Sequence, residues 1–500
     1  MGEKAQRTID FSSGQDTSSD ALGGSMTIVR NALYDSSNVA HARPGIAAWS
    51  PFPATQASGS AVIGMVAWRQ YLVYVTFDRK LHAMTGTGAH FELSSTALPE
   101  TMLDGDDRPS FVEGRDMLVI SGGGAIEKWT GSGYAARILN TGLGAAEYAA
   151  LGLPNDPGGD PPTAGDICGI AGRLLAQRPN TTGQMWWSGP LEEYENWDMA
   201  YGGASYIQAS AKPDPIVAMT ENTNEVFAWG SETLQIFAPS NLAVDALDSN
   251  NTLDFAPSRT LNVGITAPAG IVMADDQYHV LDRNRRIILT DGRGYNDTSK
   301  QVAKRLREMT TVNDCWGFRM RYSRYDCAVF MFPSENVGLV YDRLQGKWSE
   351  WTEWDAGEAP LSITSAYYWA DQDVFVVGMD DGRIAQLDDT ATTDLGKPIK
   401  VQLVSGFNAG TGLKVCDSLM LTFRRKFETT TTSGHVLLSG RDYEGAWETL
   451  AMVELGADPH PSEVVRALGV YRQRQLMLEY TGDDGFDFVS AVETFENLGA

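Results

Sequence analysis

A two-stranded pattern recurs seven times along the sequence at a nearly constant spacing. Each copy joins a short apolar run to a second run of alternating character through a polar turn, which is typical of a β-hairpin. Successive copies begin 46 to 56 residues apart, close to the repeat of about 40 to 50 residues in propeller blades. Because one hairpin is too small to bury its own apolar face, we expect the copies to stack radially on one another. The copies begin at Tyr71, Met117, Arg173, Glu225, Tyr278, Asp326 and Asp373.

This pattern predicts an all-β chain whose main part is a β-propeller of six to eight blades, with seven favoured. The 51 glycines and 13 tryptophans fit many short strands separated by turns. One short helix is expected after Tyr295, where Val302 and Leu306 are four residues apart. Asp297 and Thr298 are its capping candidates. A long β-sandwich with coincidental spacing is the alternative that the pattern leaves open.

The apolar pattern changes on both sides of the propeller region. Residues 1–27 are poor in apolar side chains and are expected to form a flexible polar arm. Residues 28–390 are expected to form the propeller, and residues 391–397, again poor in apolar side chains, are predicted to be a linker. Five apolar runs follow, so residues 398–500 are predicted to form a small antiparallel β-sandwich domain.

The charge of the chain excludes one broad class of function. The sequence has 39 basic and 64 acidic side chains, a formal net charge of −25. A protein that coats nucleic acid by neutralising phosphates needs the opposite sign. No apolar run approaches the roughly 18 residues of a membrane span, and the polar start lacks the apolar stretch of a signal peptide. We therefore expect no membrane span and synthesis in the cytoplasm.

The strong short motifs of enzymes are absent from the sequence. There is no H-E-x-x-H, no G-x-x-x-x-G-K-[ST], no G-x-S-x-G and no EF-hand loop. The six histidines and four cysteines are scattered, with no pair at metal-ligand spacing. We expect no enzymatic activity, and the sequence predicts no catalytic residues, no cofactor-binding residues and no metal site.

Clusters of acidic side chains and of tryptophans are the remaining candidates for a binding site. The acidic clusters could hold a hard cation, but solvated turns are the commoner use of such clusters. They are Asp104 with Asp106 and Asp107, Asp380 with Asp381, and Asp388 with Asp389. Four tryptophans could line one funnel, which would favour a carbohydrate- or receptor-binding propeller as the alternative function. They are Trp186, Trp187, Trp197 and Trp229.

Three stretches, near the start, in the middle and near the end, carry a resemblance to a known family. The first is NALYDSSNVAHARPGIAAWSPFP, which contains Arg43, Pro44 and Gly45. The second is the predicted helix QVAKRLREM followed by VYDRLQGKWSEW, in which a Tyr-Asp turn leads to a Trp-initiated strand. The third is LGVYRQRQLMLEYTGDDGFDFVSA. In this order they resemble the packaged-DNA stabilisation proteins, the tail-hub or nozzle components of short-tailed, podovirus-type bacteriophages.

The resemblance implies a structural virion protein with no catalytic residues to carry over. Such a protein is expected to form a homo-oligomeric ring, six-fold by this resemblance, below the portal and the head-to-tail adaptor protein. The ring would retain packaged DNA and conduct it during ejection, with a tail needle, tailspike or other distal tail protein beyond it. Genomic DNA is then expected to pass without tight binding. The protein is expected in the virion tail, after synthesis in the host cytoplasm.

Overall fold

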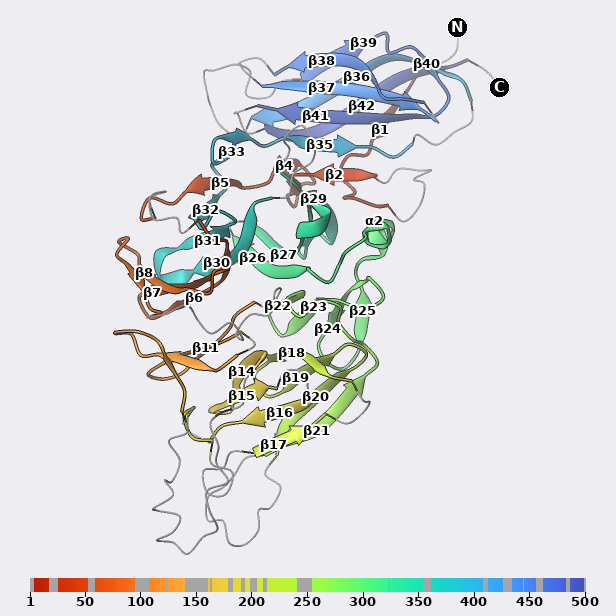
Figure 1. The fold of residues 1–500 in the computed structure, drawn as a ribbon. Helices are drawn as coiled ribbons and strands as arrows, with labels where there is room; N and C mark the ends of the chain where they lie inside the picture. The colour runs from red at the N-terminus through yellow and green to blue at the C-terminus, as the bar shows by residue number, and fades with distance from the viewer. Residues whose placement is uncertain are drawn as a thin grey trace, which may run out of the picture. The chain divides into compact units, whose positions relative to one another are not determined.

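In the computed structural model, the regular secondary structure of the described residues is almost all β-strand, as Figure 1 shows. The predicted all-β class is therefore confirmed. The structure describes residues 4–17, 26–52, 59–94, 108–122, 124–139, 161, 164–178, 183–189, 194–197, 205–209, 214–240, 254–322, 324–353, 361–407, 412–425, 434–443, 445–455, 462–482 and 486–498.

Sheets of four strands recur along the described chain, and each contains one of the predicted hairpins. Five of them use consecutive strands. The first two are β6 (Val62–Trp68), β7 (Tyr71–Thr76), β8 (Leu81–Thr85) and β9 (His90–Glu92), then β10 (Ser110–Glu113), β11 (Leu118–Ser121), β12 (Glu127–Trp129) and β13 (Ala136–Arg137). The next three are β14 (Asp166–Ile170), β15 (Arg173–Gln177), β16 (Gln184–Trp187) and β17 (Ser205–Gln208), then β18 (Ile216–Glu221), β19 (Val226–Gly230), β20 (Leu234–Ser240) and β21 (Asp254–Leu261), then β22 (Ile271–Ala274), β23 (Gln277–Leu281), β24 (Ile287–Thr290) and β25 (Tyr295–Asp297).

The sixth four-stranded sheet joins distant parts of the sequence. Its first three strands are β30 (Ile363–Trp369), β31 (Val374–Met379) and β32 (Ile384–Asp388), and its fourth is β5 (Gly45–Ala48). β32 and β5 pair antiparallel, with Asp388 opposite Gly45. A strand from the start of the chain therefore completes a sheet formed from residues late in the sequence.

The remaining predicted hairpin opens a larger sheet. Its strands are β26 (Trp316–Tyr322), β27 (Tyr325–Phe332), β28 (Val337–Asp342) and β29 (Lys347–Trp351). This meander continues into β2 (Ile28–Arg30), β35 (Val401–Val404), β41 (Arg474–Thr481), β37 (His435–Asp442) and β38 (Glu448–Glu454), which makes nine strands. The chain thus has six separate four-stranded sheets, or seven blade-like units if β26–β29 is counted as well. Either number lies within the predicted range of six to eight blades.

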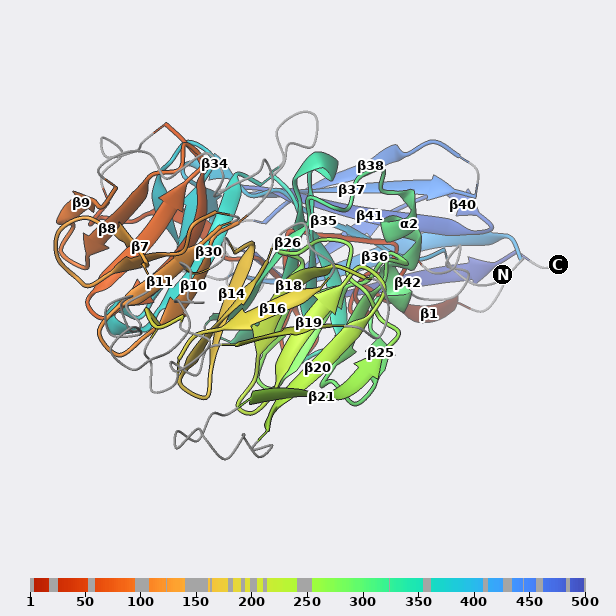
Figure 2. The ribbon, with the colours of Figure 1, turned by 60° about the horizontal axis from the view of Figure 1, so that its bottom comes forward.

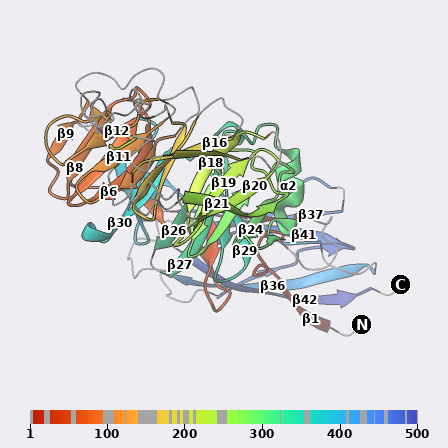
Figure 3. The same cartoon turned by 90° about the horizontal axis from the view of Figure 1, so that it is seen from below.

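Consecutive sheets within residues 50–297 pack face to face through apolar cores. Trp68 and Trp129 meet with ring centroids 5.3 Å apart in the core shared by β6–β9 and β10–β13. Further cores join β10–β13 to β14–β17, β14–β17 to β18–β21, and β18–β21 to β22–β25. The strands of these sheets can be followed in Figures 2 and 3. This serial packing is the one that radially stacked hairpins require, and it confirms the predicted β-propeller.

The C-terminal strands form two sheets around a shared apolar core, as a sandwich does. One sheet runs β3-β4-β42-β36-β39, with β1 on β42 and β40 on β36, and the other is the β2-β35-β41-β37-β38 part of the nine-stranded sheet. Leu421, Leu438, Leu478 and Phe488 are among the core residues. The strands are β1 (Lys4–Ile9), β2 (Ile28–Arg30), β3 (Ala32–Tyr34), β4 (Ala40–Ala42), β35 (Val401–Val404), β36 (Lys414–Arg425), β37 (His435–Asp442), β38 (Glu448–Glu454), β39 (Ser462–Arg466), β40 (Val470–Tyr471), β41 (Arg474–Thr481) and β42 (Phe486–Asn497).

Two compact units divide the chain differently from the predicted boundaries. Unit 1 comprises Met1–Trp49, Thr298–Ser362 and Ala385–Ala500, and unit 2 comprises Ser50–Asp297 and Ile363–Ile384. The predicted propeller region, residues 28–390, thus contributes to both units. The reason is that β2 and β4, from the start of this region, pair with β35 and β42, and β29 pairs with β2.

The predicted flexible arm, residues 1–27, is folded where the structure describes it. β1 pairs with β42 from Lys4 opposite Glu496 to Ile9 opposite Ala491. Phe11 is buried in the sandwich core. Residues 18–25 lie outside the described part of the chain. The described residues of the arm are folded because backbone pairing and a few buried side chains compensate for their low apolar content.

The predicted linker, residues 391–397, also carries structure. β33 (Thr393–Asp394) pairs with β34 (Lys397–Pro398), and Asp394 is buried. Its anchor is a buried ion pair, described below, and so the lack of apolar side chains misled the prediction.

The predicted helix forms η3 (Lys300–Val302) and α2 (Ala303–Glu308), with Val302 and Leu306 buried as expected. Neither Asp297 nor Thr298 caps it, because η3 begins after Ser299 and no side-chain cap bond forms. Two further single turns are η4 (Pro333–Glu335) and η5 (Ala370–Gln372).

Candidate functional site

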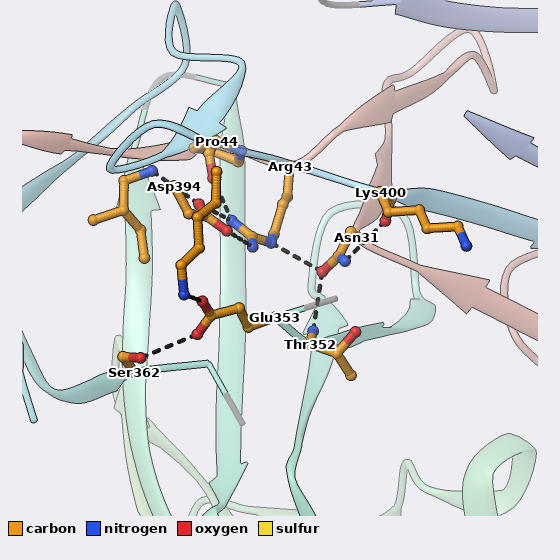
Figure 4. A network of polar contacts seen from close by, with 10 residues as sticks. Asn31, Arg43, Pro44, Thr352, Glu353, Ser362, Asp394 and Lys400 are labelled. Atoms are coloured by element: carbon orange, nitrogen blue, oxygen red, sulfur yellow. Dashed lines mark hydrogen bonds and ion pairs between the residues drawn. The ribbon is translucent and has the colours of Figure 1, made fainter. Parts of the chain in front are cut away.

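Arg43, in the first of the three family-like stretches, lies in a buried polar network within unit 1 (Figure 4). Its guanidinium donates from Nη1 to Asp394 Oδ1 at 2.9 Å and from Nη2 to Asp394 Oδ2 at 2.5 Å. Only 1% of the Arg43 surface is exposed. The guanidinium also lies over the ring of Trp351, 5.7 Å from its centroid. Arg43 and Asp394 are thus joined by two parallel hydrogen bonds. This geometry best offsets the hydration that two buried charges lose.

Asn31 extends the network to two other segments. Its side-chain oxygen accepts hydrogen bonds from Arg43 Nε and from the backbone amide of Thr352, both at 3.0 Å. Its amide nitrogen donates to the carbonyl of Lys400 at 3.0 Å. Asn31 has a φ of 52°, a left-handed conformation that asparagine tolerates better than most residues. The Asn31 side chain therefore connects the end of β2, the end of β29 and the segment just before β35.

Asp394 also orients β5. Its Oδ1 accepts the backbone amide of Ile46 at 3.1 Å, and the Leu395 amide donates to the Ile46 carbonyl at 2.7 Å. A Cβ on Gly45 would come within 2.5 Å of the Thr393 carbonyl oxygen. Backbone approaches this close require glycine. The Arg-Pro-Gly sequence therefore holds β5 against β32 and the residues that follow β32.

The second family-like stretch forms the turn from β28 to β29. Asp342 Oδ1 accepts the amides of Leu344 and Gln345, at 2.9 and 3.2 Å. The Tyr341 and Trp348 rings lie 5.0 Å apart, and Trp348 is fully buried. Burial raises the pKa of Asp342, while these two amides oppose that shift. The Tyr-Asp turn and the tryptophan thus act together as a packing unit.

The third stretch contributes Tyr471 to a buried polar cluster in the sandwich, centred on Glu493, which lies two residues after the stretch. Glu493 accepts hydrogen bonds from Arg7 Nε at 2.8 Å and from the Tyr471 hydroxyl at 2.5 Å. The Arg7 side chain comes from β1, so this cluster fixes the N-terminal strand to β42. Burial and then the hydrogen bond to Glu493 raise the pKa of Tyr471 well above its usual value. All three stretches therefore supply buried polar contacts inside unit 1.

A fourth buried carboxylate was not predicted from the sequence. Glu350 accepts a hydrogen bond from Gln15 Nε2 at 2.6 Å and lies 3.3 Å from Arg30 Nε. Arg305 Nε, on the helix α2, lies 3.5 Å from Glu350 Oε1. Gln15 comes from the predicted arm, and nothing local in that polar segment indicates that its side chain is buried.

The four tryptophans of the predicted aromatic funnel do not share one exposed surface. Trp187, Trp197 and Trp229 are 2%, 3% and 0% exposed and belong to the cores between neighbouring sheets. Trp186 is half-buried and stacks on Tyr206, with ring centroids 4.8 Å apart. The prediction that these four residues could form one aromatic ligand-binding surface is therefore wrong.

The predicted acidic clusters lie in turns where the structure describes them. Asp381 accepts from the backbone amide and Nε of Arg383, at 3.0 and 2.5 Å. Asp388 accepts from the amide and hydroxyl of Thr390. Asp104, Asp106 and Asp107 lie outside the described residues. Within the described ranges, no three potential ligands gather in a metal-binding geometry.

A carboxyl pair in unit 2 has an unusual protonation equilibrium. Asp166 accepts from Ser110 Oγ on the preceding sheet and from the Met219 amide on the following sheet, the latter at 2.6 Å. Burial, followed by the charge of Asp166, raises the pKa of Glu221 to about 7. This pair links the first strands of three consecutive sheets.

Replacing Glu221 with glutamine is expected to stabilise the protein at pH 8 by about 2 kcal/mol and to change little at pH 4.5. Because the folded pKa lies above the unfolded value, the folded state holds the proton better, and this advantage is lost as pH rises through about 7. Urea titrations at both pH values would measure the difference. Glu232→Gln, at an exposed ion pair with Arg283, is the control and should show no such pH dependence. Equal effects of both variants would contradict the prediction.

No helix in the described part of the chain is long and apolar enough to cross a membrane.

Among solved structures, the chain is similar to the designed Ika8 protein, with 11% identity, a TM-score of 0.36, and coverage of 67% of this chain and 98% of that one. It is also similar to BBS1N in complex with ARL6DN, at 13% identity, a TM-score of 0.39, and coverage of 70% and 98%.

None of the curated proteins matches the chain. A family model described as "Bacteriophage P22 Gp10, beta-propeller" matches residues 64–392. This match covers more than half of the chain and includes the second of the three family-like stretches. It confirms the resemblance seen in the sequence. The chain therefore belongs to the phage stabilisation family of structural bacteriophage proteins, which have a β-propeller fold.

Proposed function

We propose that this protein forms a homo-oligomeric ring in the virion tail, below the portal and the head-to-tail adaptor, that retains packaged DNA and conducts it during ejection. The family match over residues 64–392 is the observation that carries this proposal. The six-fold symmetry, the needle or tailspike beyond the ring and synthesis in the host cytoplasm belong to the same proposal.

The distribution of charge supports a channel that does not grip DNA. Unit 2 has 16 basic and 33 acidic side chains, a net charge of −17, whereas unit 1 has a net charge of −8. Each lysine or arginine held against a phosphate adds salt-dependent affinity, which would resist sliding. An excess of negative charge instead repels the duplex over roughly a Debye length of 8 to 10 Å.

Several arginines that could bind phosphate are already paired with carboxylates of the same chain. Arg286 donates to Asp282 at 2.8 and 2.5 Å. Arg319 and Arg343 both donate to Asp326, at 2.9 and 2.7 Å. A guanidinium engaged in this way has fewer donors left for a phosphate. Internal pairing therefore adds to the effect of the net charge.

Purified protein is expected to bind duplex DNA no more tightly than the usual non-specific range, with a dissociation constant of roughly 10⁻⁴ M or weaker at physiological salt. The reason is that an acidic chain releases few counterions from the duplex. Fluorescence anisotropy across a salt series would measure both affinity and salt slope. A micromolar affinity with a steep salt slope would contradict the non-gripping channel and indicate a DNA-gripping role.

Assembly is tested separately from DNA affinity. Purified protein mixed with portal and adaptor rings is expected to dock as a ring beneath the adaptor, visible by negative-stain microscopy. Portal rings without adaptor are the control and should remain bare. Failure to dock on the adaptor, with folded protein present, would contradict the proposed position in the tail.

A further inference from the structure

Two histidine rings are stacked in the first four-stranded sheet of unit 2. Tyr74 and His82 are register partners on β7 and β8, and their rings stack 4.9 Å apart at 18°. His90, on β9, lies next to both rings, 5.2 Å from His82 at 22° and 6.0 Å from Tyr74 at 30°. Phe52 packs edge-on against Tyr74 and His90, at 6.4 and 6.3 Å. The result is a cluster of three rings in mutual contact, with the two imidazoles next to each other.

The His82 ring has no hydrogen-bond partner inside this cluster. It is 5% exposed, and neither of its ring nitrogens has a hydrogen-bond partner among the described residues. His90 differs, because its Nε2 is 2.6 Å from the Tyr74 hydroxyl. A proton added to His82 would therefore be buried without an acceptor and beside a second imidazole, which is an unfavourable place for a charge.

The charged groups around His82 do not offset this penalty. Glu92 is its register partner on β9, and Asp78 and Lys80 lie in the turn between β7 and β8. Glu92 is already 3.4 Å from Lys80, and both side chains are substantially exposed. Burial and then the neighbouring His90 lower the pKa of His82 to about 4, although Glu92 and Asp78 act in the opposite direction. Burial also lowers the pKa of His90.

We propose that protonation of the His82–His90 stack in mildly acidic solution opens the β8–β9 hairpin of this sheet. Opening separates the two imidazoles and exposes both to water. The turn of the hairpin lies against Pro51, since a Cβ on Gly88 would come within 2.5 Å of the Pro51 carbonyl oxygen. Opening therefore also frees the segment through which the chain enters unit 2, including Phe52.

The direction of the pH dependence follows from the two states. A solvent-exposed histidine has a pKa near 6.5, whereas folded His82 has a pKa of about 4. The open state therefore takes up a proton between these values, and it gains population as pH falls from about 6.5 to about 4. Above about pH 7 the stack is neutral in both states. Between pH 7.5 and 4.5 the opening equilibrium is expected to rise by roughly 10- to 100-fold.

Hydrogen exchange of the full chain at pH 7.5 and 4.5, corrected for intrinsic exchange rates, tests the proposal. Residues 81–92 are expected to lose protection by roughly 10- to 100-fold more than the histidine-free hairpin of β27 and β28. His82→Phe keeps an aromatic ring in the cluster but cannot titrate, so it should remove most of this difference. His435→Phe, at an exposed position on β37, is the matched control and should leave the difference unchanged.

Two results of the exchange experiment would overturn the proposal. One is a wild-type hairpin whose protection does not depend on pH. The other is a His82→Phe variant that keeps the full wild-type dependence. Should this variant fold poorly, the His82 ring protons of the wild type can be titrated by NMR. A midpoint near 4 supports the proposal, and a midpoint near 6.5 overturns it because the folded stack would then bear no penalty.

Discussion

Replacing Asp394 with alanine is expected to lower the free energy of unfolding by about 3 to 5 kcal/mol. The substitution leaves the Arg43 guanidinium buried without its carboxylate and removes the acceptor of the Ile46 amide. A buried charge without a partner costs much more than the pair itself contributes. Urea titration followed by tryptophan fluorescence would measure the loss.

Two variants separate the buried pair from the simple loss of a charge. Lys397→Ala removes an ion pair with Glu353 in which the lysine is 65% exposed, and it should cost at most about 1 kcal/mol. Arg43→Met combined with Asp394→Leu removes both buried charges and should recover much of the stability. If Asp394→Ala cost no more than Lys397→Ala, the buried network would not hold β5 in place.

Replacing Trp348 with alanine is expected to cost about 3 to 5 kcal/mol, through lost burial and the cavity that remains. The indole is 0% exposed, and its Nε1 donates to the Thr298 carbonyl at 2.9 Å. The Thr298 carbonyl would also lose its donor. The same urea titration would report this loss as a lower midpoint.

Trp186→Ala is the matched control, because this tryptophan is half-buried and stacks on a tyrosine that is 48% exposed. Its expected cost is smaller, about 1 to 2 kcal/mol. Trp348→Phe should fall between wild type and Trp348→Ala, since it keeps most of the apolar surface but not the hydrogen bond. An unchanged midpoint for Trp348→Ala would contradict its role as a packing residue.

The repeated hairpins could be predicted from the sequence because their signal is local. An apolar run, a turn residue and an alternating run occur within about fifteen residues, and each of these three features has its own physical cause. Each predicted hairpin became a strand pair, as with Tyr71 in β7 and Asp373 directly before β31. The helix with Val302 and Leu306 was predicted in the same way.

The contacts of the N-terminal segment could not be predicted, because their partners lie hundreds of residues away. Gln15 and Arg43 are polar residues in segments with few apolar side chains, and polar residues are usually exposed. Their burial follows from Glu350 and Asp394, which are also polar and show no local pattern. The prediction that Trp229 lines a funnel was wrong for another reason. Propeller strands are covered on both faces, so alternation cannot distinguish a core tryptophan from one that lines a funnel.

The long-range pairing of the first strands affects how the chain folds as it leaves the ribosome. β1 pairs only with β42 among the described strands, and Ile9 lies opposite Ala491. At roughly 5 to 20 residues per second, these two residues are synthesised roughly 25 to 100 s apart. The sheets of residues 50–297 use consecutive strands and can form one after another during that time. Unit 1 can be completed only after β42 has been synthesised. A nascent chain stalled before β42 would therefore keep the N-terminal strand without its partner.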